Sequence, residues 1–101
     1  MLFRSLFATR GLQIKSLKKN EPEIYCYLLN NLGYSQFKTG DLAAENLFRE
    51  TLGTAQTLKN VPIQITAQTH LGELLIAKKD FIAASDFLYS AQKMAHDNGI
   101  F

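Results

Sequence analysis

The feature of this sequence that most constrains its fold is a set of helix-start signals that occurs twice. Asn20 and Asn60 each stand two residues before a proline. An asparagine can cap a helix, and a proline in the first turn loses no helical hydrogen bond. Asp41 and Asp80 repeat a second kind of start at nearly the same offset. The sequence therefore predicts two copies of a unit that contains two helices.

Apolar residues at three- and four-residue spacing fill the intervals between these signals, as is typical of amphipathic helices. Alternation of β-branched residues, which would indicate strands, is nearly absent. We therefore predict five helices, joined by turns near residues 20, 40, 60 and 79, over about 2–19, 22–38, 42–58, 62–78 and 81–97. Gly53 falls inside the third helix, where glycine costs about 1 kcal/mol relative to alanine, so we expect a close helix crossing there.

Two stretches of the chain share a pattern of small and large residues. The first consists of Leu32-Gly33, Gly40-Asp41-Leu42, Ala44 and Phe48, and the second of Leu71-Gly72, Leu75, Asp80-Phe81, Ala84, Leu88 and Ala91. This pattern resembles the tetratricopeptide repeat, over about residues 22–97. The period exceeds that of the usual repeat and resembles its long-helix variety, and Lys79 stands where the turn glycine belongs.

The resemblance implies an all-α fold, an antiparallel helix-hairpin array of the α-solenoid type. Residues 21–101 would form two hairpins, and residues 1–20 a separate N-terminal helix. Phe48 and Leu88 would fill the space between layers. The positions where facing helices approach one another carry the small residues Gly33, Gly72, Ala44, Ala84 and Ala91.

Composition excludes several classes of protein. The single cysteine, Cys26, excludes a disulfide framework and a cysteine-rich zinc site. No apolar run approaches the roughly 18 residues that a membrane-spanning helix needs. The net charge of +2 gives little support to nucleic-acid binding. We expect no cofactor, no metal, no nucleic acid and no membrane span.

The strongest candidate for chemistry is the pair His70 and Glu73, on one face of the same predicted helix. It is either a metal or acid–base pair or a solvated polar pair, and we favour the second because a metal needs more ligands than these two. Cys26 lacks the basic neighbour of a reactive thiol, and we interpret it as structural. We therefore expect the protein not to be an enzyme.

In tetratricopeptide arrays the leading helix of each hairpin lines a concave, partner-binding face. The resemblance implies that this face carries aromatic and polar residues, namely Tyr27, Asn30, Tyr34, Phe37, Lys38, Thr66, Thr69, Glu73 and Ile76. Such a mixture suits a protein groove. Alternatively, Tyr34 and Phe37 pack on helix 2–19 or on a neighbouring chain.

The last helix and Phe101 are expected to contact another chain, either a copy of this one or a different subunit. Arrays normally end in a helix with a polar outer face. This one still carries large apolar residues around much of its circumference: Phe81, Phe87, Leu88, Tyr89 and Met94.

Residues 1–20 carry five basic residues and no acidic one, on an amphipathic helical pattern. Such a segment resembles a mitochondrial transit peptide. It equally fits a docked terminal helix in a cytoplasmic protein, and less well a membrane-surface anchor. The expected function is a non-enzymatic scaffold or adaptor subunit of a larger assembly, which could be a homo-oligomer. The alternative is a peptide- or ligand-sensing fragment of a longer regulator.

Overall fold

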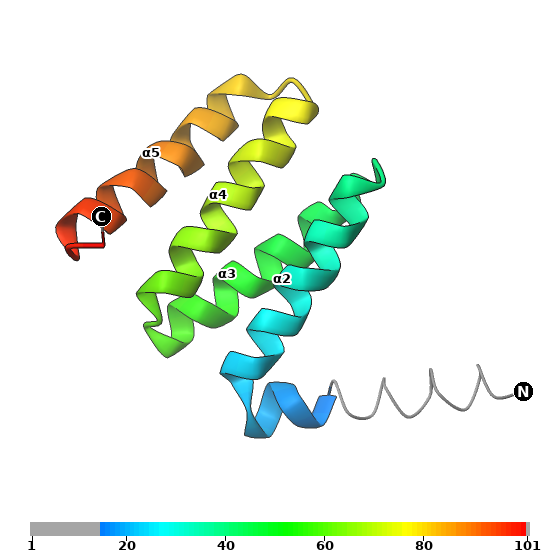
Figure 1. Cartoon of the computed structure of the whole chain (residues 1–101), viewed down its shortest axis with the longest axis vertical. Coiled ribbons are helices and arrows are strands. Elements are labelled where there is room, and N and C mark those ends of the chain that lie inside the picture. The colour runs from blue at the N-terminus through cyan, green and yellow to red at the C-terminus, as the bar shows by residue number, and fades with distance from the viewer. Residues whose placement is uncertain (1–14, 101) are drawn as a thin grey trace, which may run out of the picture.

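The fold is all-α, as the sequence predicted. The computed structural model of the chain describes residues 15–100, and these contain no strand. The four complete helices are α2 (Pro22–Lys38), α3 (Ala44–Leu58), α4 (Val61–Ala77) and α5 (Phe81–Asp97), shown in Figure 1. Residues 15–20 are also helical and lead into α2.

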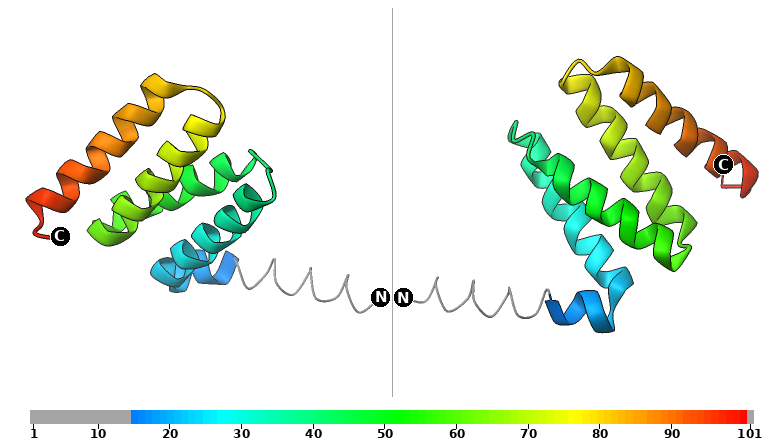
Figure 2. Two further views of the ribbon diagram at one scale, coloured as in Figure 1. Left: turned by 45° about the horizontal axis from the view of Figure 1, so that its top comes forward. Right: turned by 180° about the vertical axis from the view of Figure 1, so that it is seen from behind.

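The helices form two consecutive hairpins. α2 packs on α3 and α4 packs on α5, while α4 also packs on α3 and touches α2. Figure 1 and Figure 2 show α5 at one outer edge of the described helices, with α4 between it and the first hairpin. Consecutive helices are therefore neighbours in space, as the prediction of a helix-hairpin array requires.

Two predicted helix caps are confirmed. Asn60 Oδ1 accepts a hydrogen bond of 3.1 Å from the backbone N–H of Ile63, at the start of α4. Asp80 Oδ1 accepts one of 3.3 Å from the N–H of Ala83, at the start of α5. Each bond satisfies an amide that has no partner inside its helix.

The predicted cap at Asn20 is wrong. The residue at the cap position of α2 is Glu21, whose side chain makes no capping hydrogen bond. Asn20 lies at the end of the preceding helical segment, and its Nδ2 donates to Ser16 Oγ at 3.2 Å. The earlier helix thus runs up to the position where the cap was expected.

The predicted start of the third helix at residue 42 is slightly too early. Asp41 Oδ1 accepts a hydrogen bond of 2.9 Å from the backbone N–H of Ala43, which closes a turn. α3 then begins at Ala44. An aspartate favours such turns as readily as helix caps, because its side chain reaches the amide two positions further on.

The glycines at the centre of each hairpin are close-packing points. A Cβ atom on Gly33 would lie 2.7 Å from Phe48 Cε1, and one on Gly72 would lie 2.5 Å from both Cγ and Cδ2 of Leu88. Both distances are shorter than a carbon–carbon contact of about 3.5 Å. The predicted role of Gly33 and Gly72 is confirmed, and the small residues Ala44, Ala84 and Ala91 are buried as expected.

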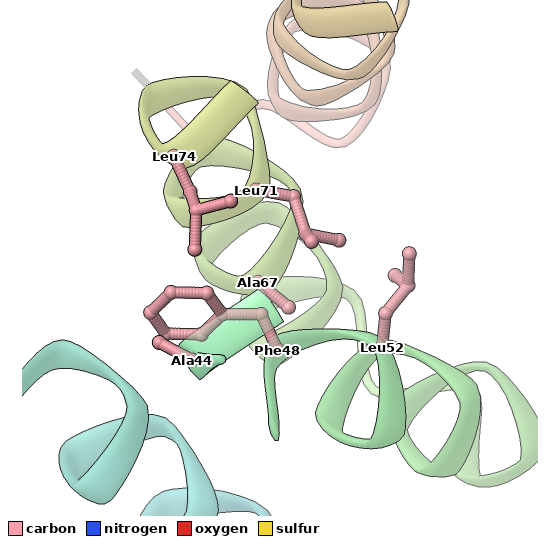
Figure 3. Close-up of a cluster of buried hydrophobic side chains, with 6 residues drawn as sticks. All are labelled: Ala44, Phe48, Leu52, Ala67, Leu71 and Leu74. Atoms are coloured by element: carbon pink, nitrogen blue, oxygen red, sulfur yellow. The ribbon is translucent and has the colours of Figure 1, made fainter. Parts of the chain in front are cut away.

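The main hydrophobic core lies between the two hairpins rather than inside either of them. Its buried members come from α3 and α4, and Figure 3 shows the ring of one of them, Phe48, facing α4. Phe37 from α2 and Phe87 from α5 pack against its edges. The buried members are Ala44, Phe48, Leu52, Ala67, Leu71 and Leu74.

An ion pair attaches the N-terminal helical segment to the first hairpin. Lys18 Nζ lies 2.8 Å from Glu50 Oε1, which also accepts a 3.0 Å hydrogen bond from the hydroxyl of Tyr25. The bond from Lys18, and after it the bond from Tyr25, lowers the pKa of the Glu50 carboxyl. The amphipathic face predicted for the N-terminal helix falls mostly in residues 1–14, which lie outside the described residues, as does Phe101.

The close crossing expected at Gly53 is wrong. Gly53 is exposed, and no atom lies within 4 Å of a Cβ built there. Gly53 and Gly72 both lie inside helices, but Gly53 has open space around it and Gly72 is closely packed. Substitution by alanine should therefore change the stability of the chain in opposite directions at the two positions.

We predict that Gly53→Ala raises the free energy of unfolding by about 1 kcal/mol, because alanine is the better helix former and has room. Gly72→Ala should lower it, because overpacking typically costs about 1–3 kcal/mol and Leu88 leaves no space. Urea unfolding of both variants checks the pair. A stabilised Gly72→Ala variant would contradict the hairpin contact.

We also predict that Lys79→Gly stabilises the chain by about 1 kcal/mol, because it relieves a left-handed backbone conformation. Lys79 has a φ of 64°, in the region that disfavours residues with a Cβ. The matched control is Lys79→Ala, which removes the same side chain but keeps the Cβ that disfavours this φ. Thermal unfolding should show a higher melting temperature for Lys79→Gly than for Lys79→Ala, and equal melting temperatures would contradict this turn geometry.

Candidate functional site

The face shared by α2 and α4 is organised around His70. Its Nδ1 lies 2.9 Å from Asn30 Oδ1 on α2. Its ring centroid lies 5.3 Å from that of Tyr34 and 5.1 Å from that of Phe48, in tilted arrangements. The histidine therefore joins three helices by one hydrogen bond and two ring contacts.

Burial lowers the pKa of His70, and the negative charge of Glu73 opposes this shift more weakly. The hydrogen-bond partner of the ring is the amide of Asn30. Within residues 15–100, no group of three or more histidine, cysteine, aspartate or glutamate side chains could hold a metal ion. The arrangement is that of a packing histidine with an amide partner.

Cys26 is fully buried, and its thiol lies 3.8 Å from the carbonyl oxygen of Thr51. Burial is the main cause that raises the pKa of this thiol, which keeps it protonated. A thiolate is the reactive form of cysteine, so this environment suits a structural side chain.

The residues predicted for the partner face divide into two groups. Exposed side chains that a partner could reach are Tyr27, Tyr34, Lys38, Thr66, Glu73 and Ile76. Asn30, Phe37 and Thr69 are half-buried. Asn30 already bonds His70, and Phe37 packs on the main core. Asn30 and Phe37 therefore serve contacts between helices, whereas Thr69 Oγ1 donates to the carbonyl oxygen of Ile65 on its own helix.

The exposed part of this face has mixed character. The side chains of Tyr27 and Tyr34 are 57% and 41% exposed, and Lys38 Nζ lies 5.2 Å from the centre of the Tyr34 ring. Thr66 Oγ1 donates to the carbonyl oxygen of Pro62 on its own helix. The face thus offers scattered aromatic and polar groups.

A groove between α4 and α5 is the more apolar surface. Its volume is about 430 Å³, and it is lined by Ile76, Phe81, Ala84, Ser85, Leu88, Tyr89 and Gln92. None of these lining side chains is charged. Sequence reasoning placed Ile76 on the other face and did not foresee the groove. The signal that could have found it is the internal repeat, which relates its lining to residues of the first hairpin.

The outward side of α5 adds to this apolar surface. Phe81, Ile82 and Tyr89 are 61%, 81% and 67% exposed. Phe87, which the sequence placed with them, instead turns inward and packs on the main core. The predicted contact of Phe101 with another chain lies outside the described residues.

A second groove, of about 470 Å³, lies at the other end of the molecule, beside the N-terminal helical segment. Lys18, Glu50 and Gly53 form part of its lining. Its walls carry the Lys18–Glu50 ion pair, whereas no charged side chain lines the groove between α4 and α5.

Comparisons of the chain with models of protein families, with curated proteins and with solved structures find no match. Among residues 15–100, no helix is long and apolar enough to cross a membrane.

We predict that the stability of the chain falls as the pH is lowered below about 6.5, in part because of His70. Its folded pKa lies below the ordinary value of 6.5, so the unfolded chain binds this proton more readily than the folded one. Stability is therefore full above that pH and declines below it.

Replacing the imidazole ring of His70 isolates its contribution to the pH dependence of stability. His70→Gln should show a shallower loss of stability between about pH 7.5 and pH 5.5 in urea unfolding. His96→Gln, which alters a histidine at the exposed end of α5 and retains His70, should keep the steeper loss. Equal slopes in the two variants would contradict the burial of a neutral imidazole.

Proposed function

We propose that this protein is a non-enzymatic scaffold or adaptor of the tetratricopeptide type, which binds another protein within a larger assembly. The observation that carries the proposal is the uncovered apolar surface of the second hairpin. Phe81, Ile82 and Tyr89 are all more than 60% exposed on one helix. Large exposed apolar surfaces on soluble proteins mark interaction sites.

The repeat geometry supports the same conclusion. A stacked hairpin buries one side on its predecessor and presents the other side to its successor. α4 and α5 pack on the first hairpin through α4, and the groove between Ile76 and Leu88 remains open. Aromatic side chains in such a position supply much of the affinity in protein interfaces.

The environments of the two side chains that could be reactive, His70 and Cys26, support a binding role rather than catalysis. His70 bonds Asn30, and Cys26 is buried as a thiol. Neither forms a nucleophile–base pair among the described residues, which is the arrangement that acyl or group transfer would require.

We predict that the tagged chain, purified from its native cells, elutes as part of an assembly much larger than 11.4 kDa. Mass spectrometry should find another protein in stoichiometric amount. A triple variant, Phe81→Ser with Ile82→Ser and Tyr89→Ser, should lose that protein while keeping its melting temperature, because these side chains are exposed.

The matched control is Tyr27→Ser, an exposed tyrosine on the α2–α4 face. It should retain the partner. A wild-type chain that elutes alone at every concentration would contradict the scaffold function. Loss of the partner in Tyr27→Ser alone would move the binding surface to the α2–α4 face.

The mitochondrial location indicated by the basic segment stays a prediction. The cytoplasmic alternative is equally compatible with the Lys18–Glu50 ion pair, which joins that segment to the first hairpin.

A further inference from the structure

We propose that the groove between α4 and α5 binds an amphipathic α-helix of a partner protein, in the position that α4 itself occupies on the first hairpin. The proposal rests on the scaffold function above and names the partner's structure and chemistry. It follows from comparing equivalent positions in the two hairpins.

The packing glycines fix the equivalence. Gly33 in α2 corresponds to Gly72 in α4, and the side chains that pack on them, Phe48 in α3 and Leu88 in α5, correspond to one another. Positions on α2 therefore map to α4 by the offset from Gly33 to Gly72. Positions on α3 map to α5 by the offset from Phe48 to Leu88.

The surface that receives α4 maps onto the groove. The residues of the first hairpin that belong to the core around α4 are Phe37, Ala44, Phe48 and Leu52. Their equivalents are Ile76, Ala84, Leu88 and Gln92. All of these equivalents line the groove between α4 and α5. The groove is thus the second copy of a helix-binding surface whose first copy is filled.

The difference in burial agrees with this mapping. Phe37 is half-buried and Leu52 is 8% exposed, because they pack in the core that α4 closes. Their equivalents in the second copy, Ile76 and Gln92, are both exposed. Figure 2 shows α5 as the outermost of the described helices, with none lying over its outer side.

The apolar face of the partner helix follows from α4. α4 presents a small residue and two leucines, Ala67, Leu71 and Leu74, to the first copy of the surface. The pattern is small-x3-Leu-x2-Leu on one face of a helix. α4 follows α3 through a short turn and runs antiparallel to it, so the partner helix should run antiparallel to α5.

The polar residues of the partner helix follow from two replacements. Glu45, which binds Lys78 at the end of α4 at 2.7 Å, is replaced in the second copy by Ser85, so a lysine there gains no ion pair. Tyr34, which contacts the ring of His70, is replaced by Glu73, which is exposed. A basic residue at the position of His70 would therefore meet a carboxylate. The partner helix is apolar on one face and basic beside it.

The probe is a peptide with the sequence of residues 61–77 of this chain and the change His70→Arg. A hydrocarbon link between the side chains at positions 68 and 72 keeps the peptide helical. The link lies on the helix face that packs on α5 in the folded chain, so it leaves free the face with Ala67, Leu71 and Leu74. Binding to the full chain is measured by fluorescence anisotropy. The comparison peptide carries His70→Glu, should bind at least threefold more weakly, and should approach the first peptide's affinity at high salt.

Two variants of the full chain test the groove. Ser85→Arg places a bulky cation in the groove lining and should weaken binding of the arginine peptide at least tenfold. Gln56→Arg introduces the same side chain at an exposed position on α3, outside that lining, and should change binding less than twofold. Ser85 and Gln56 are both exposed, and unchanged melting curves confirm the fold of each variant.

The proposal would be overturned by no binding of the arginine peptide or by equal effects of the two variants. A wild-type dimer in sedimentation that Ser85→Arg alone dissociates would also overturn it, and would make a second copy of this chain the occupant. The scaffold function fails separately, if the chain purifies alone from its native cells. If a native partner still co-purifies with the Ser85→Arg variant, the scaffold function holds but the proposal that a helix binds in this groove is wrong.

Discussion

The packing of α4 on both of its sides holds this structure together. Toward the first hairpin α4 buries Leu71 and Leu74 against Phe48, and toward α5 it offers Gly72 to Leu88. Within residues 15–100, both clusters of buried apolar residues draw their members from both hairpins. A small domain can be stable in this way only if the shared helix is well packed, since burial of apolar area is the dominant favourable contribution to folding.

Much of the fold could be predicted from the sequence because its signals are local. Asn60 and Asp80 cap helices by bonding amides three residues further along the chain. Gly33 and Gly72 lie where helices pack closely, and glycine is recognisable in the sequence as the residue that permits this. The same kind of signal misled at Asn20, where the preceding helix continues up to the expected cap. A cap depends on where the previous element ends, which local sequence does not state.

The candidate site was harder to predict because it depends on contacts between segments far apart in the chain. The resemblance implied that Phe37 lies on a binding face, yet its ring packs on the core between hairpins. Phe87 was grouped with the apolar residues of the last helix that were expected to contact another chain, and it packs on the same core instead. Ile76 was assigned to the α2–α4 face, and it lines the groove beside α5 as well. Which face of a helix is covered depends on the neighbours that the fold supplies.

Native-state hydrogen exchange tests most directly the claim that α4 is the shared centre of the array. The account predicts that the amides of α4 around Leu71 exchange slowest and only through global unfolding, together with those of α3 around Phe48. Amides of α5, which packs on one side only, should also open through smaller fluctuations. Faster exchange in the centre of α4 than in α5 would contradict the account, because it would mean that the hairpins are held together elsewhere.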